Sequence, residues 1–165
     1  MSQANAYHKK RKFTAVRNFG PDALTPKNKI STLAYESIMA TKQIIKPKNS
    51  PAAVGPYNHA VRVGDLLFCA GQIPIDPANG KLVSCDIKAQ TERVLLNVKA
   101  ILDDQKLTFA NVVKSTVYLT NLADFAGMNE IYSKFFTEYF PARSTVQVAA
   151  LPKGANVEIE VIAHF

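Results

Sequence analysis

One residue suited to binding an anionic small molecule is Arg143, in the stretch "FPARST" (140–145). A guanidinium is always charged, and its planar fork of N–H donors matches a carboxylate in a two-point contact. The arginine follows Pro141, which cannot lie inside a helix, and precedes the run "STVQV". We therefore expect Arg143 to lie where the chain turns from a helix into its next strand. The alternative is an ordinary surface arginine.

A second candidate is Glu158, in the strand-like run "VEIEVI" (157–162). Successive strand residues point to opposite faces, so Glu158, Glu160 and Ile162 share one face while Val157, Ile159 and Val161 occupy the other. A carboxylate on a partly apolar face can hold and polarise a water molecule. The alternative is that both carboxylates lie in solvent.

Two further positions could complete such a site. Tyr57 follows Gly55 and Pro56, which fix a turn, so its phenol is either aimed into a cleft or packed beneath the loop. Gly71, in "AGQIP", either lets a ligand approach the backbone closely or marks a strand end or bulge.

Metal and cofactor chemistry have little support in the sequence. The three histidines, His8, His59 and His164, are scattered and have no zinc-ligand spacing with Cys69 or Cys85. The chain contains no G-x-S-x-G motif, no phosphate loop and no dinucleotide-binding glycine motif. Both cysteines fit reduced thiols better than a disulfide framework. We expect no metal and no cofactor.

Length and composition fit one globular domain without a membrane span. The chain has 165 residues, of which 47% are hydrophobic. No apolar run approaches the roughly 20 residues needed to cross a bilayer. The longest candidate, "DLLFCAGQIPI", is interrupted by Gly71, Gln72 and Pro74.

The positive charge is concentrated in residues 1–38, which contain seven lysines and arginines and two acidic residues. This segment therefore supplies five of the seven net positive charges of the chain. This segment has no sustained periodicity, and we interpret it as a basic, mostly disordered extension before a domain of residues 39–165. Its composition favours a mitochondrial presequence and hence a protein of the mitochondrial matrix. Fusing residues 1–38 to a reporter and measuring its import into mitochondria tests this interpretation. A solvated tail on a cytoplasmic protein and a nuclear or nucleic-acid patch in "HKKRK" remain open. The nearly neutral domain itself gives little support to nucleic-acid binding.

Beyond the extension, the hydrophobic pattern predicts an α+β domain. The expected strands are 42–46, 59–63, 66–71, 112–120, 144–148 and 156–163, and the expected helices are 87–102 and 125–136. Gly64 and Asp65 predict a hairpin turn between the second and third strands. Ser84 or Asp86 can cap the first helix and Asn121 the second.

The order of these elements favours a mixed sheet with both helices on one face. The other face then carries a mixture of apolar and polar side chains, which is typical of an interface between subunits.

Several stretches, taken in order, resemble the RidA/YjgF family of enamine and imine deaminases, in particular its mitochondrial or cytosolic eukaryotic members. They include "GPY", "GQIP", "FPARS" and "LPKG" followed by "VEIE", all between about residue 42 and the C-terminus. The resemblance implies a chorismate-mutase-like α+β fold assembled as a homotrimer. In such a trimer the sheets surround a central β-barrel, and the active sites lie between neighbouring subunits.

The resemblance also implies an activity, the hydrolysis of 2-iminobutanoate, 2-iminopropanoate and their enamine tautomers to 2-oxo acids and ammonia. Pyridoxal-phosphate enzymes such as threonine dehydratase release these compounds, which links the reaction to metabolite repair and isoleucine biosynthesis. The implied catalytic residues are Arg143 for the substrate carboxylate, Glu158 for the attacking water and Tyr57 for orientation. The implied substrate-binding residues also include Gly71, Asn129 and Thr145. No cofactor is implied.

Two positions depart from a common pattern of the family. Thr145 stands where many members have a cysteine, and Ala70 replaces a frequent serine, so this chain lacks that thiol and that hydroxyl. Two other functions reported in the family remain open: a non-catalytic ligand-binding or regulatory protein, such as a translation inhibitor or chaperone-like factor, and a ribonuclease. A ribonuclease predicts a basic cleft, for which the nearly neutral domain gives little support.

Overall fold

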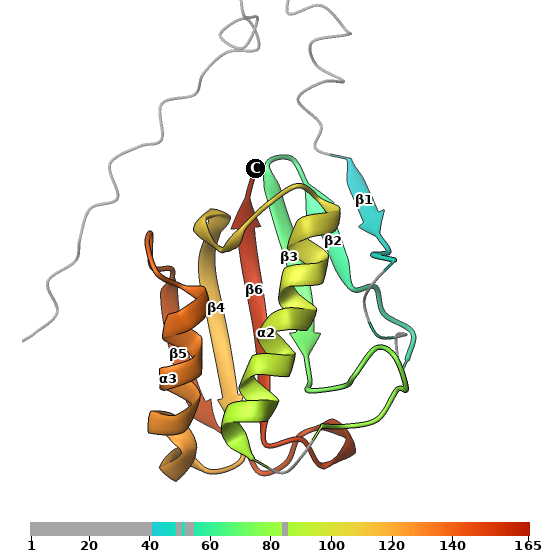
Figure 1. The fold of residues 1–165 in the computed structure, drawn as a ribbon. Helices are drawn as coiled ribbons and strands as arrows, with labels where there is room; N and C mark the ends of the chain where they lie inside the picture. Colours follow the sequence, from blue (N-terminus) through green and yellow to red (C-terminus); the bar gives the residue numbers. More distant parts are fainter. Residues whose placement is uncertain (1–40, 49–50, 52–54, 84–85) are drawn as a thin grey trace, which may run out of the picture. The chain divides into compact units, whose positions relative to one another are not determined.

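Six strands form one mixed sheet in the computed structural model, which describes residues 41–48, 51, 55–83 and 86–165 (Figure 1). The strands are β1 Lys42–Ile45, β2 Ala60–Val63, β3 Leu66–Gln72, β4 Val112–Leu119, β5 Ala142–Gln147 and β6 Val157–His164. Their order across the sheet is β1-β2-β3-β6-β4-β5. The β4–β5 pair is parallel and the other pairs are antiparallel, as a mixed sheet requires.

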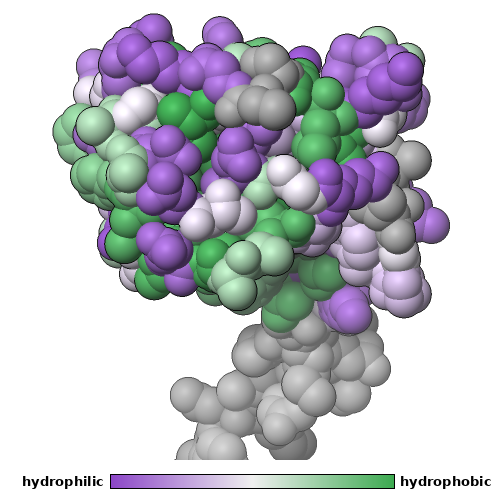
Figure 2. All heavy atoms as spheres, turned by 90° about the horizontal axis from the view of Figure 1, so that it is seen from below, coloured by the Kyte–Doolittle hydropathy of each residue, from purple (hydrophilic) through white to green (hydrophobic). Residues whose placement is uncertain are grey.

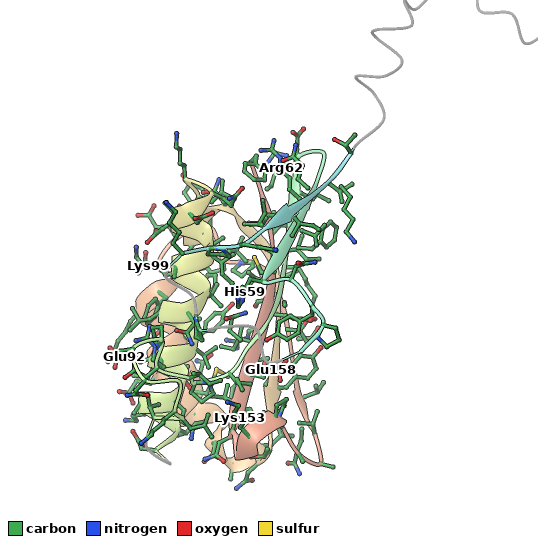
Figure 3. The ribbon with its side chains drawn as sticks, turned by 90° about the vertical axis from the view of Figure 1, so that its right-hand side faces the viewer. His59, Arg62, Glu92, Lys99, Lys153 and Glu158 are labelled. Carbon is green, nitrogen blue, oxygen red and sulfur yellow. The ribbon has the colours of Figure 1, made fainter. Side chains whose placement is uncertain are left out.

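Two α-helices cover one face of this sheet, as predicted (Figures 1 and 3). They are α2 Ile87–Asp104 and α3 Phe125–Phe135. The short 3-10 helices of the described residues are η2 Phe109–Asn111, η3 Leu122–Asp124 and η4 Pro152–Gly154. The core lies between helices and sheet, where Val157, Ile159 and Val161 of β6 are almost completely buried. Apolar side chains at helical spacing on α2, such as Val94 and Val98, meet them.

The other face of the sheet carries both apolar and polar side chains. Phe68 of β3 and Val146 of β5 are 42% and 43% exposed, which is high for large apolar residues. Glu160 lies among them and accepts a hydrogen bond of 3.2 Å from the Tyr118 hydroxyl. Figure 2 shows hydrophobic and hydrophilic residues interspersed on the end of the molecule seen from below. Phe68, Val146 and Glu160 confirm the predicted mixture on the uncovered face of the sheet, which is called the open face below.

The start of β5 corrects one prediction from the sequence. The strand begins at Ala142, before the predicted 144–148, because it pairs in parallel with β4 from Lys114 onward. Arg143 therefore lies within β5, opposite Ser115, and not in a turn ahead of the strand. This pairing fixes which way its side chain points.

The helix caps confirm one prediction and correct another. The Asp86 carboxylate accepts a hydrogen bond of 3.0 Å from the Ala89 amide and caps α2, as expected. Asn121, in contrast, accepts from the Ala123 amide and caps η3 instead of α3. The reason is that a 3-10 turn lies between Asn121 and the α-helix, so Asp124 occupies the N-cap position of α3.

Three predictions fall on residues that the structure does not describe: the extension of residues 1–38, the alternative cap Ser84, and Cys85. Cys69, within the described part, is a buried free thiol. Burial raises its pKa to about 12, so the thiol is unreactive at neutral pH. None of the helices in the described ranges combines the length and apolar character that crossing a bilayer demands.

The caps generate a prediction about stability. Asp86→Ala removes a side-chain acceptor from the first turn of α2 and should lower the free energy of unfolding by about 1 kcal/mol. Asp124→Ala is the matched control, because the Asp124 side chain makes no capping bond at the start of α3. Urea unfolding monitored by circular dichroism measures both. Equal losses in the two variants would contradict the assigned caps.

Candidate active site

Three of the predicted site residues, Tyr57, Gly71 and Glu158, come together on the open face, and we call them the carboxylate half-site. They line a cavity of about 410 Å³. Its other lining residues are Ala70, Ile73 and Pro152. The cavity thus has a mainly apolar wall with one carboxylate, which suits a small ligand that carries a short apolar group.

Gly71 is required in this half-site because Glu158 occupies the space beside its backbone. A Cβ at position 71 would overlap Oε1 of Glu158 and lie 2.8 Å from its Cδ. The β3–β6 register shifts between Cys69 and Gln72, so Gly71 also lies in an irregular part of the strand. The glycine therefore lets the carboxylate pack directly against the main chain of β3.

The electrostatics of Glu158 suit a proton acceptor. Burial, and to a lesser extent the negative charge of Glu160 on the same face, raise the pKa of Glu158 above the ordinary glutamate value. A carboxylate with a raised pKa is a stronger base once ionised, and it can carry a proton closer to neutral pH.

The other three predicted residues, Asn129, Arg143 and Thr145, come together on the helix-covered face, and we call them the arginine half-site. Nη1 of Arg143 donates a 2.8 Å hydrogen bond to Oδ1 of Asn129 on α3. The guanidinium carbon lies 4.6 Å from the ring centre of Tyr132. Thr145 follows two positions later on β5 and therefore shares this face.

The two half-sites lie on opposite faces of the sheet within one chain. Arg143 pairs with Ser115, which pairs with Val161, one of the buried residues that face the helices. Glu158 pairs with Tyr118 on the open face. Cross-strand partners point to the same side, so the side chains of Arg143 and Glu158 point away from each other across the sheet.

Sequence reasoning missed residues that support each half-site. Tyr132 and Phe125 of α3 lie beneath the guanidinium, with the Phe125 ring centre 5.6 Å away. Both recur at helical spacing along α3, but periodicity alone cannot show which strand residue they meet. Ile73 and Pro152 of the cavity wall lie outside the main strands, in stretches without hydrophobic periodicity.

The described residues contain no group of three or more histidine, cysteine, aspartate or glutamate side chains arranged to hold a metal ion.

Comparison with known proteins places the chain in a family. Residues 47–165 match the family described as Endoribonuclease L-PSP. Reactive Intermediate Deaminase A, chloroplastic, of Arabidopsis thaliana is 43% identical over 133 residues, covering 81% of this chain and 71% of that protein. A RutC family protein of Pyrococcus abyssi is 50% identical over 123 residues, covering 74% of this chain and 97% of the relative.

Solved structures are similar in fold as well as in sequence. E. coli TdcF with bound serine has a TM-score of 0.71 and 43% identity, covering 74% of this chain and 98% of that one. The YJGF gene product from E. coli has a TM-score of 0.70 and 45% identity, and the match covers 74% of this chain and 98% of that one. The sheet and helices thus define an α+β protein of the YjgF/RidA fold. The chain belongs to the Endoribonuclease L-PSP family, which includes the RidA proteins.

The raised pKa of Glu158 generates a prediction about stability and pH. Folding disfavours the ionised carboxylate, so the parent protein loses stability as the pH rises from the ordinary glutamate pKa, about 4.3, through the raised value. Glu158→Gln should therefore raise Tm at pH 7 to 8. The advantage should vanish below about pH 4, where the parent side chain is protonated in both states.

Thermal melts at fixed protein concentration measure this difference. Glu92→Gln is the control, since Glu92 is exposed on the outer side of α2 (Figure 3). It should produce no comparable dependence on pH. If the Glu158→Gln protein is less stable than the parent at neutral pH, burial of the ionised Glu158 carboxylate does not destabilise the folded state and the prediction is wrong.

Proposed function

We propose that the protein hydrolyses short 2-imino acids and their enamine tautomers to 2-oxo acids and ammonia, as a homotrimer with active sites between neighbouring chains. The substrates are compounds such as 2-iminobutanoate and 2-iminopropanoate, which pyridoxal-phosphate enzymes release. The observation that carries the proposal is the placement of an arginine half-site and a carboxylate half-site on opposite faces of one sheet.

A second copy of the chain is needed to join the two half-sites. The open face exposes Phe68 and Val146 among polar groups, as expected of a surface buried between subunits. Arg143 and Thr145 of the arginine half-site lie on β5, at the edge of the sheet, where they can reach a neighbouring chain. In a closed trimer, the arginine half-site of each chain meets the carboxylate half-site of the next, and the sheets enclose a central barrel.

The joined half-sites contain the groups that imine hydrolysis needs. Arg143 binds the substrate carboxylate in a two-point contact and fixes the adjacent carbon, C2, of the imine. Glu158 takes a proton from water as the water oxygen bonds to C2, giving a carbinolamine. Glu158 returns this proton to the former imine nitrogen, which becomes an amino group. It then takes the proton of the hydroxyl and delivers it to the nitrogen as the C–N bond breaks, so that ammonia leaves and the 2-oxo acid forms.

Two relatives support this choice of substrate. The Arabidopsis relative is named as a deaminase of reactive intermediates. E. coli TdcF has been solved with bound serine, an amino acid whose carboxylate is attached to the carbon that bears nitrogen. A 2-imino acid has the same arrangement, and the apolar wall of the 410 Å³ cavity suits its short side chain.

The proposed role of Arg143 generates the test of this function. Arg143→Lys keeps the charge but loses the planar fork, so we expect kcat/KM for 2-iminobutanoate to fall strongly. The loss of a charge-assisted two-point contact corresponds to about 2–4 kcal/mol, on the order of 30- to 1,000-fold. The assay couples a threonine dehydratase to clearance of the imine and measures ammonia and 2-oxobutanoate.

Arg62→Lys is the matched control. Arg62 contacts the Phe165 ring and the Gly64 carbonyl oxygen toward the other end of the sheet from Glu158 (Figure 3). This variant should keep the parental rate. Sedimentation and thermal melts confirm that each variant remains folded and assembled. If assembled Arg143→Lys protein clears the imine as fast as the parent, Arg143 does not bind the substrate carboxylate.

A further inference from the structure

Two amide side chains are buried on α2, away from solvent. Gln90 is 2% exposed and Asn97 is 1% exposed. They are seven positions apart, about two helical turns, so they lie along one side of the helix. Residues of α2 between them, such as Val94, belong to the apolar core. Since burying an amide in such surroundings is unfavourable without hydrogen bonds, the partners of these two side chains explain their position.

Asn97 holds the segment that follows β3. Its Nδ2 donates hydrogen bonds of 3.1 Å to the Ile73 carbonyl oxygen and 2.9 Å to the Ile75 carbonyl oxygen. Both hydrogen bonds go to one short stretch of main chain, while Oδ1 is buried with no hydrogen-bond partner among the described residues. Ile73 also lines the cavity of the carboxylate half-site.

Gln90 holds the segment that precedes β6. Its Oε1 accepts a 2.9 Å hydrogen bond from the backbone N–H of Asn156. Asn156 lies two positions before Glu158, and its own carbonyl oxygen accepts a bond from the Thr120 amide at the end of β4. The start of β6 is thereby fixed to both α2 and β4.

The two segments held by α2 also pack against each other. Ile73, Ile75 and Ala155 form a small buried cluster that is separate from the main core. Beyond this cluster, Gly71 and Glu158 approach so closely that the space for a Cβ on the glycine is filled by the carboxylate. A small shift of either segment would therefore move Glu158 relative to the cavity.

We propose that Gln90 and Asn97 are positioning residues: from α2 they hold the two main-chain segments that place the Glu158 carboxylate against Gly71. Neither side chain touches the substrate. The proposal rests on the deaminase function proposed above in that the carboxylate so placed is the one that activates water.

The test compares two near-isosteric variants with a matched control. Gln90→Met removes the acceptor for Asn156, and Asn97→Leu removes both donors to the Ile73–Ile75 segment. Thr91→Val is the control, because Thr91 is also fully buried on α2 but its hydroxyl donates to the Ile87 carbonyl oxygen within the same helix. Steady-state kinetics with 2-iminobutanoate give kcat and KM, and ¹³C NMR titration of the Glu158 carboxyl gives its pKa.

We expect Gln90→Met and Asn97→Leu to lower kcat at least about tenfold with a much smaller change in KM, because a misplaced base slows the chemical step more than substrate binding. The pKa of Glu158 should fall toward the ordinary value in both, as water reaches the loosened carboxylate. Thr91→Val should leave kcat and this pKa at parental values even if its Tm falls.

The proposal is overturned if the folded Gln90→Met and Asn97→Leu proteins keep the parental kcat and the parental pKa of Glu158. It is equally overturned if Thr91→Val changes kcat and the pKa of Glu158 as strongly, since the effect would then be a general loosening of the core. If Asn97→Leu fails to fold, Gln90→Met decides alone. If the parent protein itself releases no ammonia, the deaminase function fails, and the Glu158 titration still decides whether α2 positions the carboxylate.

Discussion

The two-residue period of β6, at the centre of the sheet, is the constraint on which the site depends. Val157, Ile159 and Val161 must face the helices because they form the sheet's side of the hydrophobic core. Glu158, between the first two, must then face the opposite way, onto the open face. A one-residue slip of this strand would turn the valine and isoleucine side chains to the open face and Glu158 toward the core. The register that stabilises the fold therefore also orients the candidate base.

The same constraint separates the carboxylate from the arginine. Arg143 lies against α3, where it donates a hydrogen bond to Oδ1 of Asn129 and packs on the ring of Tyr132. A guanidinium held in this way is better suited to two-point binding than a mobile one. Because this support comes from the helix-covered face, the arginine cannot meet Glu158 in its own chain. Assembly is therefore part of the proposed chemistry, and the proposed trimer would also remove the exposed apolar residues of the open face from water.

Features that depend on local sequence were predicted well. The alternation of β6, the hairpin between β2 and β3, and the Asp86 cap each follow from a few neighbouring residues. The start of β5 and the direction of Arg143 were not predicted, because they follow from parallel pairing with β4, some 30 residues earlier in the chain. The family resemblance named the six site residues, but only the sheet register divides them into two half-sites. The positions of Gln90 and Asn97 likewise depend on contacts with distant segments.

The division of the site between chains is tested most directly by mixing two defective variants. Arg143→Ala chains keep the carboxylate half-site, and Glu158→Gln chains keep the arginine half-site. If each active site takes one half from each of two neighbours, trimers reassembled from equal amounts should recover roughly a quarter of the parental deaminase rate, since that fraction of interfaces pairs two intact halves. If the mixed trimers are as inactive as the separate variants, the site lies within a single chain and the division proposed here is wrong.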